Sequence, residues 1–329
     1  MRRETLPRRW ARRCVTIPGV CLAFLAATQA LPVLLLVALL VDLARRRFDW
    51  PTVRLTLFLW CALFTEVFGL TLLGLLFAVT LFRPAARAEH TWAVQRLYTS
   101  LHWTFLRSIF RLRVETEGAE LAARAPVLLL VRHASLVDVL VPGVLVAGPH
   151  LIRLRYALKR ELLWEPCLDV AGHWLPNHFV ARGGQDTDMD IEGVRQLKDG
   201  LGAKDGVILF PEGTRFSAAR RARAIEKLPA GSAERAAAEG LKSLLPLRLG
   251  GVLALLAAPP PCDVLFVGHA GLEGLTQLGD IWRGQLTGRT LEVKFWREPA
   301  HSIPAGAEAQ WAWLQQCWER MDQWLSRSR

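Results

Sequence analysis

Two side chains in the stretch LLLVRHASLVDVL, residues 128–140, are of the types that move protons. An apolar run ends at Arg132 and His133, and Asp138 follows five positions after the histidine. A carboxylate bound to one ring nitrogen of a histidine fixes the tautomer and leaves the other nitrogen able to accept a proton. On a straight helix the two side chains would lie roughly 140° apart, so the pair requires a helix that begins after His133. We predict a general base, His133, oriented by Asp138.

A structural explanation also exists for Asp138. The residues Ser135-Leu-Val-Asp138 have the S-x-x-[DE] form of a capping box, in which both side chains bind backbone N–H groups at the start of a helix. This explanation requires no chemistry, but it is compatible with a contact to His133. The spacing alone is a weak signal, because a chain with 8 His produces it often by chance.

The segment ILFPEGTRFS, residues 208–217, ends a strand in a turn that displays charged side chains. Its Pro and Gly fit positions i+1 and i+3 of a β-turn. A bare turn requires neither Glu212 nor Arg215, and a guanidinium fork can hold a phosphate. The alternative, a solvated basic start of a helix, explains the arginines that follow better than it explains Arg215. A further lone arginine, Arg182, ends the strand-like run NHFVAR, where a surface role is the commoner one.

Together these segments resemble the glycerolipid acyltransferase family, which contains the 1-acylglycerol-3-phosphate acyltransferases. His133 to Asp138 match its HxxxxD motif. Phe210 to Arg215 match its FPEGTR block in full, and this is the specific signal. Phe179 to Arg182 match the end of its second block, and Leu245 to Arg248 resemble its fourth. The resemblance spans about residues 120 to 270.

The sequence departs from the family pattern in the second block. Pro176 stands where Gly is usual, and His178 stands where an apolar residue is usual. The match near Arg182 is therefore less complete than the matches of the first and third blocks.

The resemblance implies a mechanism. His133 removes the proton of an acceptor hydroxyl, which attacks the thioester carbonyl of an acyl donor, and Asp138 orients and charge-stabilises the histidine. The glycerol and phosphate of the acceptor are positioned by residues of the second and third blocks, namely Glu212, Gly213, Thr214, Arg215 and Arg182. No metal and no resident cofactor are expected, and acyl-CoA or acyl carrier protein (acyl-ACP) brings the acyl group as co-substrate.

These residues must be positioned at the edge of a sheet. Strand-like runs at 125–131, 154–159, 177–182, 206–210, 263–269 and 291–296 alternate with helical stretches from about residue 119 onward. This alternation predicts an α/β fold with a mixed, largely parallel sheet and flanking helices, whose ligand sites lie at the carboxyl ends of the strands. The expected catalytic domain covers 119–300, and a packing helix covers 301–329.

Two apolar runs precede this domain. No charged residue lies between Arg13 and Asp42, and Glu66 is the one charged residue between Arg54 and Arg83. As a helix each run would reach about 40 Å, against a hydrocarbon core of roughly 30 Å. We therefore predict a membrane helical hairpin over 1–82, which spans the bilayer or, because Pro18 and Pro32 interrupt the first run, dips into one leaflet.

Residues 83–118 are expected to form an interfacial amphipathic helix, or alternatively a helix packed on the next domain. Arginines before, between and after the apolar runs favour both ends of the hairpin on the cytoplasmic side. The chain is thus expected to be an integral or monotopic membrane protein with its catalytic domain on the cytoplasmic face.

Composition narrows the class of partner. A net charge of +11 indicates an anionic partner, while the positive mean hydropathy and 13 Trp favour a membrane surface over nucleic acid. The six cysteines contain no CxxC pair and indicate free thiols in a reducing compartment. A metal site from His173, His178 and Cys167 fits no standard spacing, and neither a GxSxG elbow nor a P-loop is present.

We expect acyl transfer to the free hydroxyl of a lysophospholipid, with 1-acyl-glycerol-3-phosphate, which yields phosphatidic acid, as the first choice of acceptor. The alternatives are a lyso-ornithine lipid, lysocardiolipin or lysophosphatidylinositol as acceptor, or a non-catalytic membrane protein that binds lipid. The expected partners are the lysophospholipid, the acyl thioester, membrane lipids and, for one class of donor, acyl carrier protein. Nucleic acid is not expected among them.

Overall fold

The computed structural model describes residues 4–180 and 188–327. The chain divides into two compact units. Unit 1 comprises Met1–Arg113, Leu158–Gly183 and Gln277–Arg289, and unit 2 comprises Val114–Ala157, Gly184–Thr276 and Thr290–Arg329. The four-segment division expected from the sequence stays a prediction.

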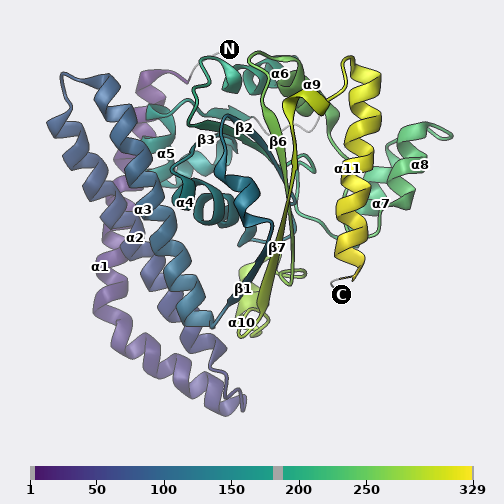
Figure 1. The fold of residues 1–329 in the computed structure, drawn as a ribbon. Helices are drawn as coiled ribbons and strands as arrows, with labels where there is room; N and C mark the ends of the chain where they lie inside the picture. Colours follow the sequence, from purple (N-terminus) through teal and green to yellow (C-terminus); the bar gives the residue numbers. More distant parts are fainter. Residues whose placement is uncertain (1–3, 181–187, 328–329) are drawn as a thin grey trace. The chain divides into compact units, whose positions relative to one another are not determined.

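The strands form one seven-stranded sheet in the order β1-β7-β6-β2-β5-β3-β4 (Figure 1). Their bounds are β1 (Arg113–Glu117), β2 (Val127–Val131), β3 (Arg153–Lys159), β4 (His178–Val180), β5 (Asp205–Leu209), β6 (Asp263–Ala270) and β7 (Thr290–Glu298). Strand β2 pairs in parallel with β5 and β6, β3 pairs in parallel with β5, and β6 pairs antiparallel with β7. The expected mixed, largely parallel sheet is confirmed.

Strand β2 lies at the centre of this sheet, and each of its five residues is buried. Its sequence, VLLLV, has no polar alternation, as expected for a strand covered on both faces. Val131, its last residue, stands opposite Val267 of β6. Strand β2 therefore ends beside the carboxyl half of β6, and Arg132, the next residue, is still buried.

The helices of unit 2 are α4 (Gly148–His150), α6 (Asp188–Arg195), α7 (Ala218–Glu226), α8 (Ala233–Gly240), α9 (Leu249–Ala257) and α11 (Ala307–Arg327), with short helical turns at Ala119–Ala123, Asp138–Leu140, Gly143–Ala147, Gln196–Lys198 and Ala300–Ser302. Helices α6, α9 and α11 bury one large apolar cluster against the sheet. In α11 the side chains of Leu314, Trp318, Met321 and Leu325 are buried at helical spacing in this cluster. The stripe is therefore part of the core.

Unit 1 is mainly helical. Its helices are α1 (Leu6–Ala44), α2 (Pro51–Val79), α3 (Pro84–Phe110), α5 (Pro166–Trp174) and α10 (Leu278–Trp282), with a further turn at Arg160–Trp164. Helices α1 and α2 form the expected hairpin, and α3 returns along α2 (Figure 1). Both α1 and α2 are long and apolar enough to cross a membrane.

Candidate active site

The loop between β2 and the helical turn at Asp138 holds His133, and distant backbone and side-chain groups fix its main chain. The N–H of His133 donates to Oε1 of Glu212 at 2.6 Å, and its carbonyl oxygen accepts from the N–H of Phe216 at 2.7 Å. Both partners belong to the segment that follows β5, the parallel neighbour of β2. The first and third sequence motifs are thus joined through the backbone of the histidine.

The side chain of His133 contacts Asp138 as the sequence predicts. Nδ1 of the ring lies 3.1 Å from Oδ1 of Asp138, whose side chain is fully buried. The helical turn begins only at Asp138, so the ring can fold back over the loop. Because Nδ1 is directed at the carboxylate, Nε2 is the nitrogen available for proton transfer. His133 itself is about one-eighth exposed, at 12 % of its side-chain surface.

The capping explanation for Asp138 is also correct, and it uses the other oxygen. Oδ2 accepts from the N–H groups of Ala134 at 2.6 Å and Ser135 at 2.7 Å. In return, Oγ of Ser135 accepts from the N–H of Asp138 at 3.1 Å. One carboxylate therefore closes the loop with Oδ2 and orients the histidine with Oδ1.

The ionisation of Asp138 follows from these contacts. Burial by itself raises the pKa of this carboxyl, but hydrogen bonds to His133 and to His269 outweigh it, and the pKa is held well below its usual range. The acid is therefore a carboxylate at neutral pH. A permanent negative charge beside Nδ1 would favour the protonated ring, and this suits His133 to the role of a general base.

The carboxyl group of Glu212 is buried, whereas a contact with substrate would require it to be accessible. Its side chain is buried, and its second oxygen, Oε2, accepts from the N–H of Leu245 at 2.9 Å. Burial raises the pKa of Glu212 to about 8, in spite of the backbone donors from His133 and Leu245. In this structure Glu212 bridges two loops, and its predicted contact with the acceptor stays a prediction.

Gly213 adopts a left-handed conformation and brings an arginine close to the turn. Its φ is +66°, and a Cβ atom built there would lie 2.5 Å from Nε of Arg248. The N–H of Arg248 donates to the carbonyl of Pro211 at 2.8 Å, which fixes the second arginine beside the loop. Only a residue without a side chain allows this approach. Arg248 was missed as a site residue, although the fourth-block resemblance pointed to its segment.

Arg215 is half-buried, and its Nη1 donates to the carbonyl of Thr276 at 2.6 Å. A guanidinium has five N–H groups, so this contact orients the fork and leaves donors for an anion. Thr214 is half-buried in the same turn. Arg182, the remaining predicted contact, lies outside the described residues 4–180 and 188–327.

Two buried residues behind the loop had no signal in the sequence analysis. His269 on β6 is fully buried and lies 3.4 Å, Nε2 to Oδ2, from Asp138. Arg132 is fully buried and forms an ion pair with Glu273 at 2.6 Å. A histidine in the apolar run DVLFVGH resembles an ordinary core residue, and its partner Asp138 lies in the helical turn that follows β2.

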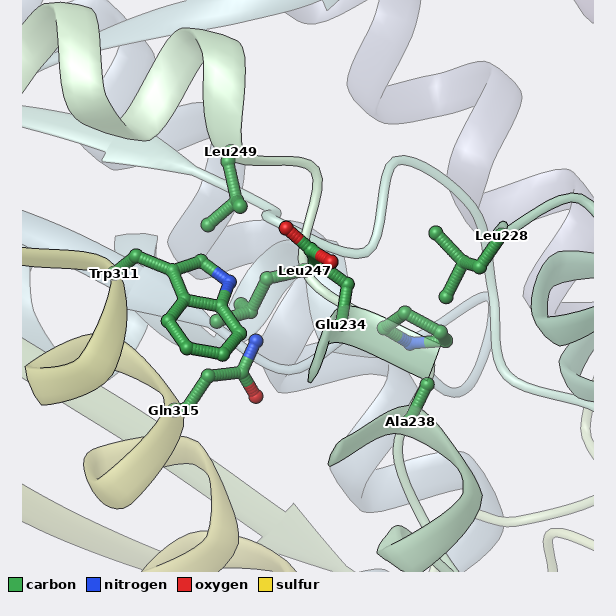
Figure 2. A pocket seen from close by; sticks show the side chains of 8 residues that line it. Leu228, Glu234, Ala238, Leu247, Leu249, Trp311 and Gln315 are labelled. Atoms are coloured by element: carbon green, nitrogen blue, oxygen red, sulfur yellow. The ribbon is translucent and has the colours of Figure 1, made fainter. Parts of the chain in front are cut away.

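A small cavity of about 90 Å³ is lined by Leu247 and Leu249, the two chain neighbours of Arg248 (Figure 2). Figure 2 also shows Trp311, Glu234 and Gln315 around it. Pockets for drug-sized ligands measure roughly 300 to 1,000 Å³, so this cavity holds neither substrate. Within the described ranges, no three residues among His, Cys, Asp and Glu are grouped to hold a metal ion.

Comparisons with known proteins find a family similarity over the segment that contains the site. Residues 113–258 match the family model described as Acyltransferase. Among solved structures, the chain is similar to the 1-acyl-sn-glycerophosphate (LPA) acyltransferase PlsC from Thermotoga maritima, with 16 % identity and a TM-score of 0.45 over 81 % of this chain and 95 % of that chain. A comparison with curated proteins finds no match. The matched segment holds the pair His133–Asp138 and the whole FPEGTR loop, so residues 113–258 of this chain are similar to the acyltransferase family.

Proposed function

We propose that this acyltransferase moves a fatty acyl group from a thioester donor to the free hydroxyl of a lysophospholipid, with 1-acyl-glycerol-3-phosphate as the preferred acceptor. The observation that carries the proposal is the contact of His133 with the buried Asp138, inside the acyltransferase segment and fixed to the FPEGTR loop. A non-catalytic lipid-binding protein would not require an oriented imidazole of this kind.

The chemistry follows from the position of the ring. Nε2 of His133 takes the proton as the acceptor oxygen attacks the thioester carbonyl, and the C–O bond forms as the carbonyl becomes a tetrahedral oxyanion. The oxyanion collapses, the C–S bond breaks, and the leaving thiolate takes the proton from the imidazolium. Asp138 stays ionised throughout and stabilises the charged ring. Atoms and charge balance without a covalent acyl-enzyme.

A phosphate-bearing acceptor is supported by two arginines at the turn. Arg215 lies in the same loop as Gly213, and the side chain of Arg248 lies against Gly213. Guanidinium groups bind phosphate through paired hydrogen bonds. A neutral acceptor would leave this positive charge without a partner. The proposal therefore ranks lysophosphatidate above a lyso-ornithine lipid.

We further propose that the hairpin of unit 1 enters one leaflet and does not span the bilayer. At the hairpin turn, Nε1 of Trp282 donates to Oγ1 of Thr52 at 3.0 Å, and the guanidinium of Arg45 lies 4.3 Å from the ring of Trp282. Near the other end of α1, Arg13 binds Asp169 of α5 at 2.9 Å. Spanning would separate α10 from α5 by the whole bilayer.

The contacts of α3 support the same arrangement. The ring of Phe110 lies 5.6 Å from Phe58 of α2, and Tyr98 donates to Glu66 of α2 at 2.6 Å. The polar helix α3 therefore covers much of α2 and would be drawn into the hydrocarbon with it, at a high cost for its charged groups. The outer face of α1 is instead exposed and apolar, as Leu22, Leu25 and Leu36 show. This face is the surface that we assign to lipid.

The acceptor is tested by incubating the purified protein with labelled acyl-CoA or acyl-ACP and a panel of lysolipids. The panel contains lysophosphatidate, lysophosphatidylinositol, lysocardiolipin, lyso-ornithine lipid and a neutral monoacylglycerol. We expect transfer to lysophosphatidate at the highest kcat/KM, and His133→Ala serves as the blank. Binding of lysolipid without transfer from either donor would overturn the enzymatic proposal, and preference for the uncharged acceptor would overturn the role of the arginines.

The one-leaflet arrangement is tested with a membrane-impermeant thiol reagent on sealed vesicles of known orientation. Cys14, near the start of α1, is exposed, and a second reporter is introduced at the turn as Phe48→Cys. We expect both positions to react from the same side of the membrane. Reaction of the two positions from opposite sides would establish a spanning hairpin.

A further inference from the structure

The second histidine beside Asp138 belongs to neither sequence motif. His269 lies on β6, opposite Val293 of β7, and its ring is fully buried. Its Nε2 lies 3.0 Å from the carbonyl oxygen of Arg132 and 3.4 Å from Oδ2 of Asp138. Both neighbours are acceptors, so Nε2 of His269 carries a proton and shares it between them.

Arg132 and His269 hold each other in place. The side chain of Arg132 donates to the backbone carbonyl of His269 and, at 3.1 Å, to the carbonyl of Ser243, while its own carbonyl accepts from the ring of His269. Glu273 neutralises the guanidinium at 2.6 Å. The position of the ring is therefore fixed from two sides, and it cannot turn away from Asp138 without breaking this arrangement.

We propose that His269 is a positioning residue for the base: its Nε2–H binds Oδ2 of Asp138 and thereby limits how strongly the carboxylate attracts the proton of His133. This inference rests on the proposed function only in its catalytic consequence. The N–H of His269 withdraws charge from the carboxylate, so less negative charge remains on Oδ1 to stabilise the imidazolium. The base then returns its proton to the leaving thiolate more readily.

The charged groups around the two rings are known. His133 faces Asp138 through its ring and Glu212 through its backbone, and Arg132 precedes it in the chain. His269 faces Asp138 and Arg132, and Glu273 lies beyond Arg132. Removal of the imidazole of His269 takes away one hydrogen-bond donor to Asp138 and changes none of the charged residues named above.

The proposal is tested with His269→Leu, which removes the donor, and His269→Gln, whose amide nitrogen can reach the place of Nε2. We expect the acid limb of the kcat/KM profile to move upward in pH by several tenths of a unit in His269→Leu, with kcat lowered about tenfold, KM for the acceptor unchanged, and both effects largely reversed in His269→Gln. Val267→Ala on the same strand is the matched control, because Val267 is equally buried and the hydrogen bond that its carbonyl accepts from the N–H of Arg132 at 3.0 Å does not depend on its side chain. It should shift no pH limb.

A second readout is independent of turnover. In protein with isotope-labelled histidine, the NMR titration midpoint of His133 should rise in His269→Leu and return towards the original value in His269→Gln. If His269→Leu does not fold, His269→Asn, whose amide is too short to reach Asp138, takes its place against His269→Gln. An unchanged titration of His133 in the variant without a donor overturns the inference. Absence of acyl transfer in the original protein would overturn the proposed function alone.

Discussion

In unit 2, Nδ1 of His133 lies 3.1 Å from Oδ1 of Asp138, and in unit 1, Nδ1 of His173 lies 3.0 Å from Oδ1 of Asp169. Both carboxylates are fully buried, and both histidines are about one-eighth exposed, at 12 % and 13 %. By distance and burial the two pairs are nearly equal. Their other contacts, however, give them different chemistry.

The negative charge of Asp169 is compensated by two guanidinium groups, in addition to its contact with His173. Arg12 donates to its Oδ1 at 2.8 Å, and Arg13 donates to its Oδ2 at 2.9 Å. His173 also lies 2.6 Å, through Nδ1, from the backbone carbonyl of Asp169 on the same helix. The pair in unit 1 is therefore a structural contact within α5, because little of the carboxylate charge is left for the ring, and the same carboxylate joins α5 to α1 through the two arginines.

Asp138, by contrast, is held at Oδ2 by two backbone N–H groups and by the ring of His269, with no guanidinium among these partners, and keeps its net charge for His133. Contact with an acid therefore does not by itself identify a histidine as a general base. The other partners of the acid decide whether its charge is available to stabilise an imidazolium.

The largest difference between the pairs should appear on removal of each ring. His133→Ala removes the base and should lower kcat/KM by about 10² to 10⁴, or about 3 to 5 kcal/mol of barrier. His173→Ala should leave turnover per folded molecule within about twofold, because its ring is assigned to packing only. Both are measured with acyl-CoA and detergent-dispersed lysophosphatidate, after thermal unfolding has shown that each variant folds. Equal losses in the two variants would remove the distinction.

Removal of the acid charge should separate the pairs next. In Asp138→Asn the amide can turn its NH₂ to Nδ1 and impose the wrong tautomer on His133, so kcat should fall by about 10² or more. In Asp169→Asn the guanidiniums of Arg12 and Arg13 lose their counter-charge, which should lower the unfolding temperature with little change in kcat. The measurements are steady-state kinetics and calorimetry on both proteins. A stable Asp169→Asn that is inactive would contradict the assignment.

The backbone of His133 depends on a distant residue, whereas His173 is held within its own helix. Glu212→Gln replaces one acceptor oxygen by a donor, so the N–H of either His133 or Leu245 loses its partner. We expect a loss of about 1 to 3 kcal/mol of unfolding free energy, together with lower turnover. Denaturant unfolding and activity are measured on the same samples. An unchanged unfolding free energy in the variant would show that the hydrogen bonds of Glu212 do not stabilise the fold.

The same substitution has a pH signature. The pKa of Glu212 is raised to about 8 in the folded protein against 4.5 for an ordinary carboxyl, so between these values the folded chain binds more protons than the unfolded chain. Stability from this group is complete below about pH 4.5 and is lost as the pH rises through about 8. Glu212→Gln should therefore flatten the decline in stability between pH 5 and about 9. Identical slopes in both proteins would contradict the raised pKa.

The smallest effect tests how closely the FPEGTR loop is fitted around the first pair. Gly213→Ala places a Cβ against Arg248 at a φ of +66° and should cost about 1 to 2 kcal/mol while raising KM for a phosphate-bearing acceptor. Gly231→Ala is the matched control, since Gly231 has a φ of +76° with open space around it. It should show the backbone cost without the change in KM. Equal KM values in both variants would remove Arg248 from the acceptor site.

The local parts of this protein could be predicted from its amino-acid sequence. The uninterrupted apolar run of β2, the turn after β5 and the two long apolar helices all follow from residues that are neighbours in the chain, and each is present in the structure. The pair His133–Asp138 was also within reach, because its members are five residues apart and a local cap accounts for both roles. Local patterns predict such features because backbone propensity and periodicity act over a few residues.

The groups that surround the pair His133–Asp138 are brought there by tertiary contacts and could not be predicted from the sequence. Glu212 reaches His133 across 79 positions, and His269 and Arg132 are 137 positions apart. Likewise, no residue near His173 in the sequence indicates that Arg12 and Arg13 bind Asp169. Long-range packing brings these partners together, and a carboxylate changes its chemistry with the donors that reach it, so residue types alone could not distinguish the base from the packing contact.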